Sequence, residues 1–303
     1  MKKDLIIGNA SNYTWDDLKY WVNSIRMCDF QGDVILTGTN MDRDTIEKLT
    51  DYGVQLHLHG REDEKGNIVS EEKGVPHVDR FFYIWNVMNN LKDEYRYVIT
   101  TDTRDVVFQR NPIEFIEDIK IISNDYDLIA SSEGMTYKDE PWGNSNLYQA
   151  LGPFFHNKMK DKLIYNVGVI GGGFNDVKSL MLMIFQLSLN RPIAIVDQAV
   201  YNFILDIPII KEKTFFASNY HSWAIQLGTT EEAVKAGSGD LGIQYRQNPS
   251  VYDNLYKDHQ PEFLEDIVVC ASSSVPYYIV HQYDRIPDLK AKIHAKYGDI
   301  DVA

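Results

Sequence analysis

Residues 95–108 read YRYVITTDTRDVVF, and this stretch is the strongest indication of the fold. A β-branched, apolar run ends in Asp102 and Asp105, and apolar residues resume directly after them. Such a run is typical of a buried strand, and open α/β sheets place ligand-binding residues at the carboxyl ends of their strands. Two carboxylates this close repel each other unless a cation lies between them, so the spacing indicates a divalent metal site. The alternative is an acidic turn in which Arg104 pairs with one of the two acids.

Composition and charge limit the classes of partner. The 303 residues contain no long linker, so we predict one domain over 1–303, with a core at about 1–210 and a less regular segment at about 211–303. A net charge of −14 argues against nucleic acid or an anionic membrane surface as the main partner. Two cysteines give neither a disulfide framework nor metal-ligand spacing. No apolar run suits a signal peptide or reaches the roughly 20 residues of a membrane span, so we expect a cytoplasmic protein.

Strand-like and helix-like segments alternate along the first two thirds of the chain. We expect strands near residues 5–7, 33–38, 54–59, 95–101, 126–130 and 165–170, with a later one at 276–280. Helices are expected at 15–25, 42–52, 76–88, 112–119, around 147, at 176–189 and at 197–204, and residues 60–74 are interpreted as a mobile surface loop. This alternation predicts an α/β fold with a mostly parallel central sheet and helices on both faces.

Polar or glycine-rich groups follow several of these strands at the point where each strand ends. They are residues 9–13, Asp102 with Asp105, residues 131–133 and the triglycine at 171–173. Because the carboxyl ends of parallel strands meet at one edge of a sheet, we expect these groups to converge on one ligand site. The triglycine lacks the Gly-Lys-Ser/Thr ending of a phosphate-binding loop, so space for a close backbone or ligand approach is the simpler reason for it.

Three further side chains are candidates at a distance from the acidic strand. A lone histidine such as His281 is usually structural, but an imidazole is a suitable third ligand for a metal held by two carboxylates. Asp197 begins a predicted helix, where capping is the simple interpretation. Capping does not explain the adjacent Gln198, since Gln is a poor cap residue.

The order of the motifs along the chain resembles that of a GT-A-fold glycosyltransferase and is most similar to the retaining family 8 type. The matching motifs are Asn12-Tyr13 for the nucleotide base, Arg80 before the acidic strand, Asp102 to Asp105 for the Asp-x-Asp motif, Asn166-Val167-Gly168-Val169, Asp197-Gln198 and His281. They span nearly the whole chain. Two departures stand out. The acids form Asp-Thr-Arg-Asp instead of Asp-x-Asp, and HQYDR at 281–285 replaces the family's His-x-x-Gly-x-x-Lys-Pro-Trp ending.

The resemblance implies a Rossmann-like three-layer sandwich of GT-A type and a specific reaction. A sugar would move, with retention, from a nucleoside diphosphate to an acceptor hydroxyl on a glycan, a lipid-linked acceptor or a protein. Mn²⁺ or Mg²⁺ would be held by Asp102, Asp105 and His281, while Asp197 and Gln198 would lie beside the anomeric carbon. The donor, preferably a UDP-sugar, would contact Asn9, Ala10, Asn12, Tyr13, Arg80, Thr101, Asp102, Thr103, Glu133, Asn166 and Gly171.

Two other functions stay open at this point. A sugar-phosphate nucleotidyltransferase shares the fold and the acidic site, but it usually carries a basic residue directly after its first strand. Residues 8–13 here, GNASNY, contain none. A non-catalytic carbohydrate- or nucleotide-binding protein on the same fold is favoured only by Arg104 inside the acidic motif. The sequence leaves the sugar, the acceptor and the oligomeric state open.

Overall fold

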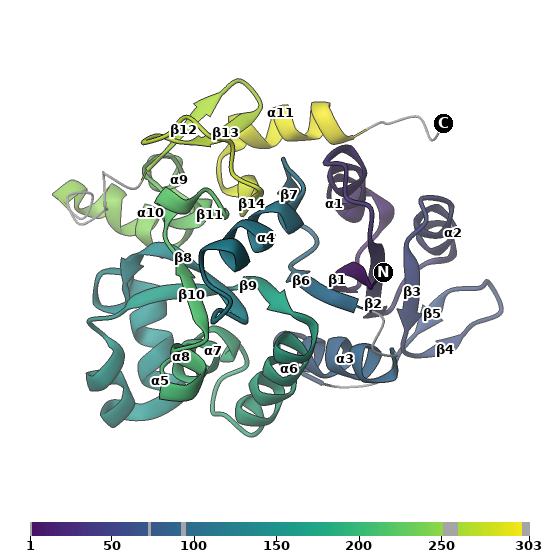
Figure 1. The fold of residues 1–303 in the computed structure, drawn as a ribbon, viewed down its shortest axis with the longest axis horizontal. Helices are drawn as coiled ribbons and strands as arrows, with labels where there is room; N and C mark the ends of the chain where they lie inside the picture. Colours follow the sequence, from purple (N-terminus) through teal and green to yellow (C-terminus); the bar gives the residue numbers. More distant parts are fainter. Residues whose placement is uncertain (1, 72–73, 92–94, 251–259, 299–303) are drawn as a thin grey trace.

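A seven-stranded sheet runs through the middle of the molecule in the computed structural model, which describes residues 2–71, 74–91, 95–250 and 260–298 (Figure 1). Its strands, in spatial order, are β10 (Thr214–Ala217), β8 (Leu128–Thr136), β9 (Leu163–Gly173), β6 (Tyr95–Thr101), β1 (Lys3–Ser11), β2 (Asp33–Thr39) and β3 (Gln55–Leu58). Neighbouring strands are parallel except at β9, which runs antiparallel to both β8 and β6. The predicted α/β fold with a mostly parallel central sheet is confirmed.

Helices cover both faces of this sheet because successive strand residues point to opposite sides. In β1, Leu5 and Ile7 join one core cluster and Ile6 joins the other. The Ile7 side is covered by α3 (Pro76–Asn90), α5 (Pro141–Met159), α6 (Phe174–Ser188) and α7 (Asp197–Leu205). The Ile6 side is covered by α1 (Trp15–Met27), α2 (Arg43–Asp51) and α4 (Pro112–Ile122), which gives three layers (Figure 1).

A second, three-stranded sheet joins the acidic motif to the end of the chain. It consists of β11 (Ala224–Gln226), β14 (Ile279–His281) and β7 (Val106–Phe108). The strand β14 pairs antiparallel with β7, which sets His281 opposite Val106, the residue after Asp105. It pairs in parallel with β11, which sets Gln226 opposite His281. Strand pairing across more than 170 residues of sequence therefore brings the late histidine to the two acids.

The last third of the chain is more regular than expected. Its remaining elements are α8 (Pro208–Lys211), η2 (Asn219–His221), η3 (Leu227–Thr229), α9 (Glu231–Lys235), α10 (Gly239–Gln247), β12 (Pro261–Leu264), β13 (Ile267–Cys270), η6 (Tyr283–Arg285) and α11 (Pro287–Tyr297). The segments before α11 are short, which explains why periodicity did not predict them. Among the described residues, no helix combines the length and the apolar character needed to cross a membrane.

The structure corrects two sequence expectations, one about a surface loop and one about the length of a strand. The expected surface loop at 60–74 contains a small hairpin of β4 (Arg61–Glu62) and β5 (Ile68–Val69), although residues 72–73 lie outside the described part. Its turn is closed by Asp63, whose Oδ1 accepts hydrogen bonds from the backbone amides of Lys65 and Asn67 at 2.8 and 2.9 Å. The strand expected at 126–130 continues to Thr136, with every residue of β8 buried. A short element, η1 (Tyr137–Asp139), then leads into α5.

Candidate functional site

A cavity of about 600 Å³ lies at the edge of the central sheet where β1, β6 and β8 end. Its size is within the range of small-molecule sites in proteins. Eleven of the predicted site residues line it: Asn9, Tyr13, Arg80, Asp102, Thr103, Asp105, Glu133, Asn166, Asp197, Gln198 and His281. The strand-end groups of β1, β6 and β8 thus converge on one cavity, as parallel strands require.

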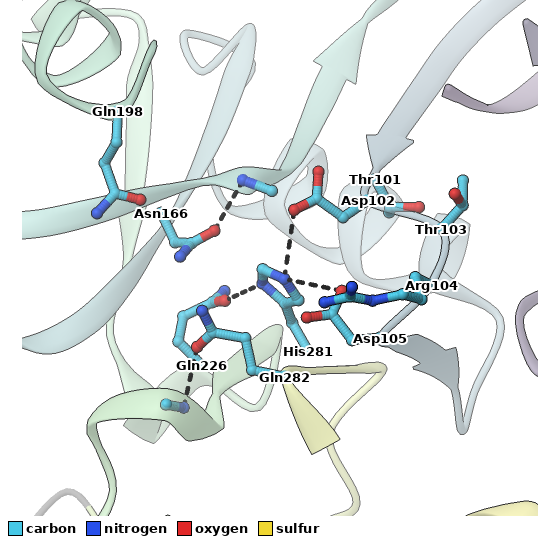
Figure 2. Close-up of polar contacts among 12 residues, drawn as sticks. Thr101, Asp102, Thr103, Arg104, Asp105, Asn166, Gln198, Gln226, His281 and Gln282 are labelled. Carbon is cyan, nitrogen blue, oxygen red and sulfur yellow. Dashed lines mark hydrogen bonds and ion pairs between the residues drawn. The ribbon is translucent and has the colours of Figure 1, made fainter. Parts of the chain in front are cut away.

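Asp102, Asp105 and His281 form the one metal-compatible group of three found among the described residues (Figure 2). One ligand atom from each lies within 4.8 Å of the others. The His281 Nε2 atom lies 3.5 Å from Asp102 Oδ2 and 3.6 Å from Asp105 Oδ1. Two carboxylates and one imidazole are a donor set that suits Mn²⁺ or a similar divalent cation. The residues present therefore fit the metal that the sequence predicted.

The imidazole of His281 is held by Gln226, which sequence reasoning missed. The Gln226 Oε1 atom lies 2.6 Å from His281 Nδ1, on the opposite side of the ring from the two acids (Figure 2). With this amide orientation, Nδ1 carries a proton and donates a hydrogen bond to Gln226, so Nε2, which faces Asp102 and Asp105, is the nitrogen that a cation would bind after displacing its proton. A metal-ligating histidine is usually fixed in this way by a second hydrogen bond.

Replacing Gln226 by leucine is expected to lower the affinity for Mn²⁺ roughly 10- to 100-fold, because the histidine loses the group that fixes its tautomer and ring orientation. Gln226→Glu, which keeps an oxygen acceptor at the same place, should retain most of the affinity. Titration calorimetry with Mn²⁺ alone measures both. Equal affinities of the leucine variant and the wild type would show that Gln226 does not orient a metal ligand.

The three groups of the triad also shift one another's protonation. Burial lowers the pKa of His281, but the carboxylates of Asp105 and Asp102 outweigh it and raise the pKa to about 10. Burial raises the pKa of Asp102, but Arg80 and His281 outweigh it and hold the pKa well below its ordinary value. The negative charge of the two acids is therefore balanced by Arg80 and by the protonated His281, or by a metal ion that displaces the imidazole proton.

Arg80 connects the acidic motif to the start of α7. One terminal nitrogen of its guanidinium is paired with Asp102, and the other lies 2.7 Å from Asp197 Oδ2. The helix begins at Asp197 itself, with Val196 as its cap residue. Asp197 is therefore not an N-cap, since its carboxylate is bound to the arginine and is almost fully buried. The predicted residues from α3, β6 and α7 form one ion-pair network.

A hydrogen-bonded carboxylate lies at the centre of the cavity wall. Glu133 Oε1 accepts hydrogen bonds from Asn166 Nδ2 at 2.8 Å and from Gln198 Nε2 at 3.1 Å. Burial raises the pKa of Glu133, although both amides oppose the shift. The Asn166 Oδ1 atom in turn accepts a hydrogen bond from the Gly168 amide at 2.7 Å. These contacts hold the side chains of Glu133, Asn166 and Gln198 in place. All three line the cavity, where they can contact a ligand.

Four predicted donor-binding residues do not line the cavity. Thr101 accepts a hydrogen bond from Trp21 Nε1 at 2.9 Å and so serves to hold α1 on the sheet. Ala10 is buried in the core under α1, and Asn12 is exposed with a positive φ of 62°. Gly171 pairs with Ile99 and Ile129 inside the sheet.

The triglycine was wrongly expected at the ligand-binding edge of the sheet. Because β9 is antiparallel to its neighbours, its carboxyl end, residues 171–173, lies at the opposite edge, and its first half brings Asn166 and Gly168 to the cavity. Gly171 packs closely against Trp223, whose ring atom Cζ2 would lie 2.9 Å from an added Cβ. The glycine thus allows a close packing contact, which is the steric role suggested by the sequence.

Several cavity residues were not predicted. They are Trp142 and Glu140 at the start of α5, Ile195 before α7, Gly228 and Thr229 in η3, and Ser238 to Leu241 at the start of α10. Trp142 and Ile195 are large apolar side chains that stay more than a third exposed. The sequence carries this tryptophan at the start of α5 without any indication of what it faces.

Glu140 makes protein stability depend on pH. Burial, and next the charge of Glu133, raise the pKa of Glu140 from 4.5 to about 7. The folded state therefore binds this proton more tightly than the unfolded state. The protonated Glu140 thus adds to the free energy of unfolding; this contribution is fully present below pH 4.5 and is lost as pH rises to 7. The loss should reach at most about 3 kcal/mol. Urea unfolding of the wild type and Glu140→Gln at pH 5 and pH 8 measures it. An equal pH dependence in both proteins would contradict this assignment.

Comparisons with known proteins support the fold only. No protein-family model matches the chain, and no curated protein sequence matches it either. Among solved structures, the apo form of WbbM, a bifunctional glycosyltransferase, matches with a TM-score of 0.55 and 11% sequence identity. The match covers 96% of this chain and 50% of that one, so this chain spans about half the length of the solved protein. This chain therefore has a Rossmann-like fold that also occurs in a glycosyltransferase.

Proposed function

We propose that the chain is a metal-dependent glycosyltransferase of GT-A type, which transfers a sugar from a nucleoside diphosphate to an acceptor hydroxyl. The observation that carries this proposal is the group of Asp102, Asp105 and His281 at the strand-end cavity of a fold shared with a known glycosyltransferase. Phosphate-bearing ligands of open α/β sheets bind at this edge. The donor in this proposal is a UDP-sugar.

The triad would hold Mn²⁺ or Mg²⁺, which would neutralise the charge that develops on the departing diphosphate. Arg80 lies beside this position, but its two terminal nitrogens are already bound to Asp102 and Asp197. Its role in the proposal is to fix both carboxylates in place. Asn9 and Tyr13, at the end of β1, form the wall that would receive the nucleoside.

The opposite wall would hold the donor sugar. Glu133 and Asn166, which fix each other by a hydrogen bond, can orient sugar hydroxyls. Asp197 and Gln198 lie at the same wall, where a carboxylate can stabilise the positive charge that develops on the sugar ring. This role fits transfer with retention, whereas a base role for Asp197 would fit inversion.

The segment after residue 210 would provide the acceptor side. It contributes η3 and residues 238–241 to the cavity, next to the exposed ring of Trp142. An aromatic face beside backbone and hydroxyl groups is suited to a glycan-type acceptor, because it combines an apolar surface with hydrogen-bonding partners.

The test is a panel of UDP- and GDP-sugars incubated with the protein in Mn²⁺ or in EDTA, with release of free nucleoside diphosphate as the readout. We expect slow hydrolysis of at least one donor in Mn²⁺ and none in EDTA. Release of pyrophosphate from a nucleoside triphosphate and a sugar phosphate would indicate a nucleotidyltransferase instead. No turnover, together with thermal stability unchanged by Mn²⁺ plus UDP or GDP, would contradict the proposal.

A further inference from the structure

Arg104, the residue inside the acidic motif, has its side chain at the cavity. Its backbone carbonyl accepts a hydrogen bond from the Tyr283 hydroxyl at 3.2 Å, which anchors the turn between β6 and β7. The side chain stays 48% exposed and extends into the space beside Asp105 (Figure 2). The fold thus holds the backbone of this residue and leaves its guanidinium free to contact a ligand.

The guanidinium of Arg104 has no close partner in the described part of the chain. Among the described residues, its nearest carboxylate is Asp284, with Arg104 Nη2 3.8 Å from Asp284 Oδ2, and none of them forms a hydrogen bond with the guanidinium. Asp284 Oδ1 is buried and likewise accepts no hydrogen bond from the described residues. Arg285 Nε approaches that oxygen only to 3.7 Å. A cation with five donors and such loose pairing is suited to bind an anion.

The cavity is rich in carboxylates, so a ligand with several negative charges depends on each available cation, including Arg104. The described lining contains six carboxylates: Asp102, Asp105, Glu133, Glu140, Asp197 and Asp240. Its arginines are Arg80, Arg104 and Arg285. Because Arg80 is already bound by two acids, its charge is largely neutralised. A metal at the triad offsets Asp102 and Asp105, so a diphosphate needs a further cation whose donors are unoccupied.

Arg104 lines the same cavity as Tyr13 of the nucleoside wall and the metal ligands Asp102 and Asp105. Its charge acts on both sides, since it lowers the pKa of Tyr13 against the larger effect of burial. In turn, Asp105 raises the pKa of Arg104 against the effect of burial. A ligand that extends from Tyr13 to the triad would come near this guanidinium, and the group it would present there is the phosphate next to the nucleoside.

We propose that Arg104 binds the nucleoside-proximal phosphate of the donor and exchanges its loose pairing with Asp284 for hydrogen bonds to phosphate oxygens. This inference rests on the proposed function. It also gives Arg104 a role in donor binding, although the residue was the one feature of the acidic motif that favoured a non-catalytic protein.

The test measures binding of UDP, UMP and uridine by titration calorimetry to the wild type, Arg104→Gln and Arg104→Lys, in Mn²⁺. Arg104→Gln should weaken UDP and UMP by roughly 10- to 100-fold and leave uridine unchanged, since only the phosphate contact is lost. Arg104→Lys should recover part of the loss, because a lysine keeps the charge without the bidentate geometry. Arg285→Gln removes the same charge from the cavity and is the matched control, with UMP affinity expected within about twofold of wild type.

Four outcomes would overturn the inference. Loss of UDP binding without loss of UMP binding would place the contact at the distal phosphate. Equal losses in Arg104→Gln and Arg285→Gln would show a general charge effect, and a parallel loss of uridine would show a damaged pocket. Unchanged nucleotide affinity with a raised acceptor KM would assign Arg104 to the acceptor. By contrast, a wild type that binds neither UDP nor GDP would contradict the proposed function itself.

Discussion

Replacing Asp105 by asparagine is expected to abolish Mn²⁺-dependent donor hydrolysis and to lower the Mn²⁺ affinity by at least roughly 100-fold. The substitution keeps the size of the side chain and removes one of two anionic ligands. The Asp105 carboxylate is nearly buried, so bulk water cannot take its place as a metal ligand when the charge is removed. Its backbone carbonyl accepts a hydrogen bond from the Gln282 amide at 2.8 Å, and this contact survives the change. Electron paramagnetic resonance of free Mn²⁺ measures the affinity without any substrate.

Asp127→Asn is the control for a general loss of negative charge. Asp127 precedes β8 at the opposite edge of the sheet and is paired with Lys120 and Lys213. This variant should bind Mn²⁺ like the wild type. If Asp105→Asn also binds Mn²⁺ with wild-type affinity and an unchanged circular dichroism spectrum, the triad is not a metal site, and the hypothesis of a salt-bridged acidic turn is the better one.

The strands of the central sheet were predictable because each is specified by the residues of its own short segment. The runs at residues 5–7, 33–38 and 95–101 are apolar on both faces, as strands covered by helices on both sides must be. The direction of a strand relative to its neighbours is not specified by its own residues. The sequence 165–173 reads the same whether β9 runs with its neighbours or against them, and only the second arrangement separates Asn166 from the triglycine. The misplacement of Gly171 follows from this single unknown.

The candidate site was predicted in part for the same reason. Asp102 and Asp105 are only three positions apart in sequence, so their proximity needs no tertiary information. The chemistry of an imidazole made His281 a candidate ligand and the resemblance supported it, but no local pattern placed it beside the acids, because pairing of β14 with β7 is a contact over a long sequence separation. Gln226 carried one weak signal, a polar residue directly after the apolar run at 223–225, and the structure shows it fully buried. Its partner depends on the register of β11 and β14, which no periodicity encodes.

Gly168 lies against two of the three proposed metal ligands, His281 and Asp102, and against Asn166. The Asp102 amide donates to its carbonyl at 2.8 Å, so the glycine backbone positions the first acid. A Cβ added here would lie 2.5 Å from His281 Cε1, 2.8 Å from Asp102 Oδ2 and 2.9 Å from Asn166 Oδ1. All three are fixed side chains in hydrogen bonds or ion pairs, so none can move without breaking a contact of the site.

Gly168→Ala is therefore expected to reduce Mn²⁺ affinity and donor hydrolysis at least tenfold and to destabilise the fold by about 1–3 kcal/mol, because the added methyl displaces His281 or Asp102. Gly173→Ala is the matched control on the same strand. Its Cβ would meet only the flexible Asp176 carboxylate, at 2.9 Å, and it lies at the far edge of the sheet. Mn²⁺ titration and urea unfolding of both variants test the expectation. Wild-type Mn²⁺ affinity in Gly168→Ala would mean that His281 and Asp102 do not hold a metal in this arrangement, since the arrangement has no room for the methyl group.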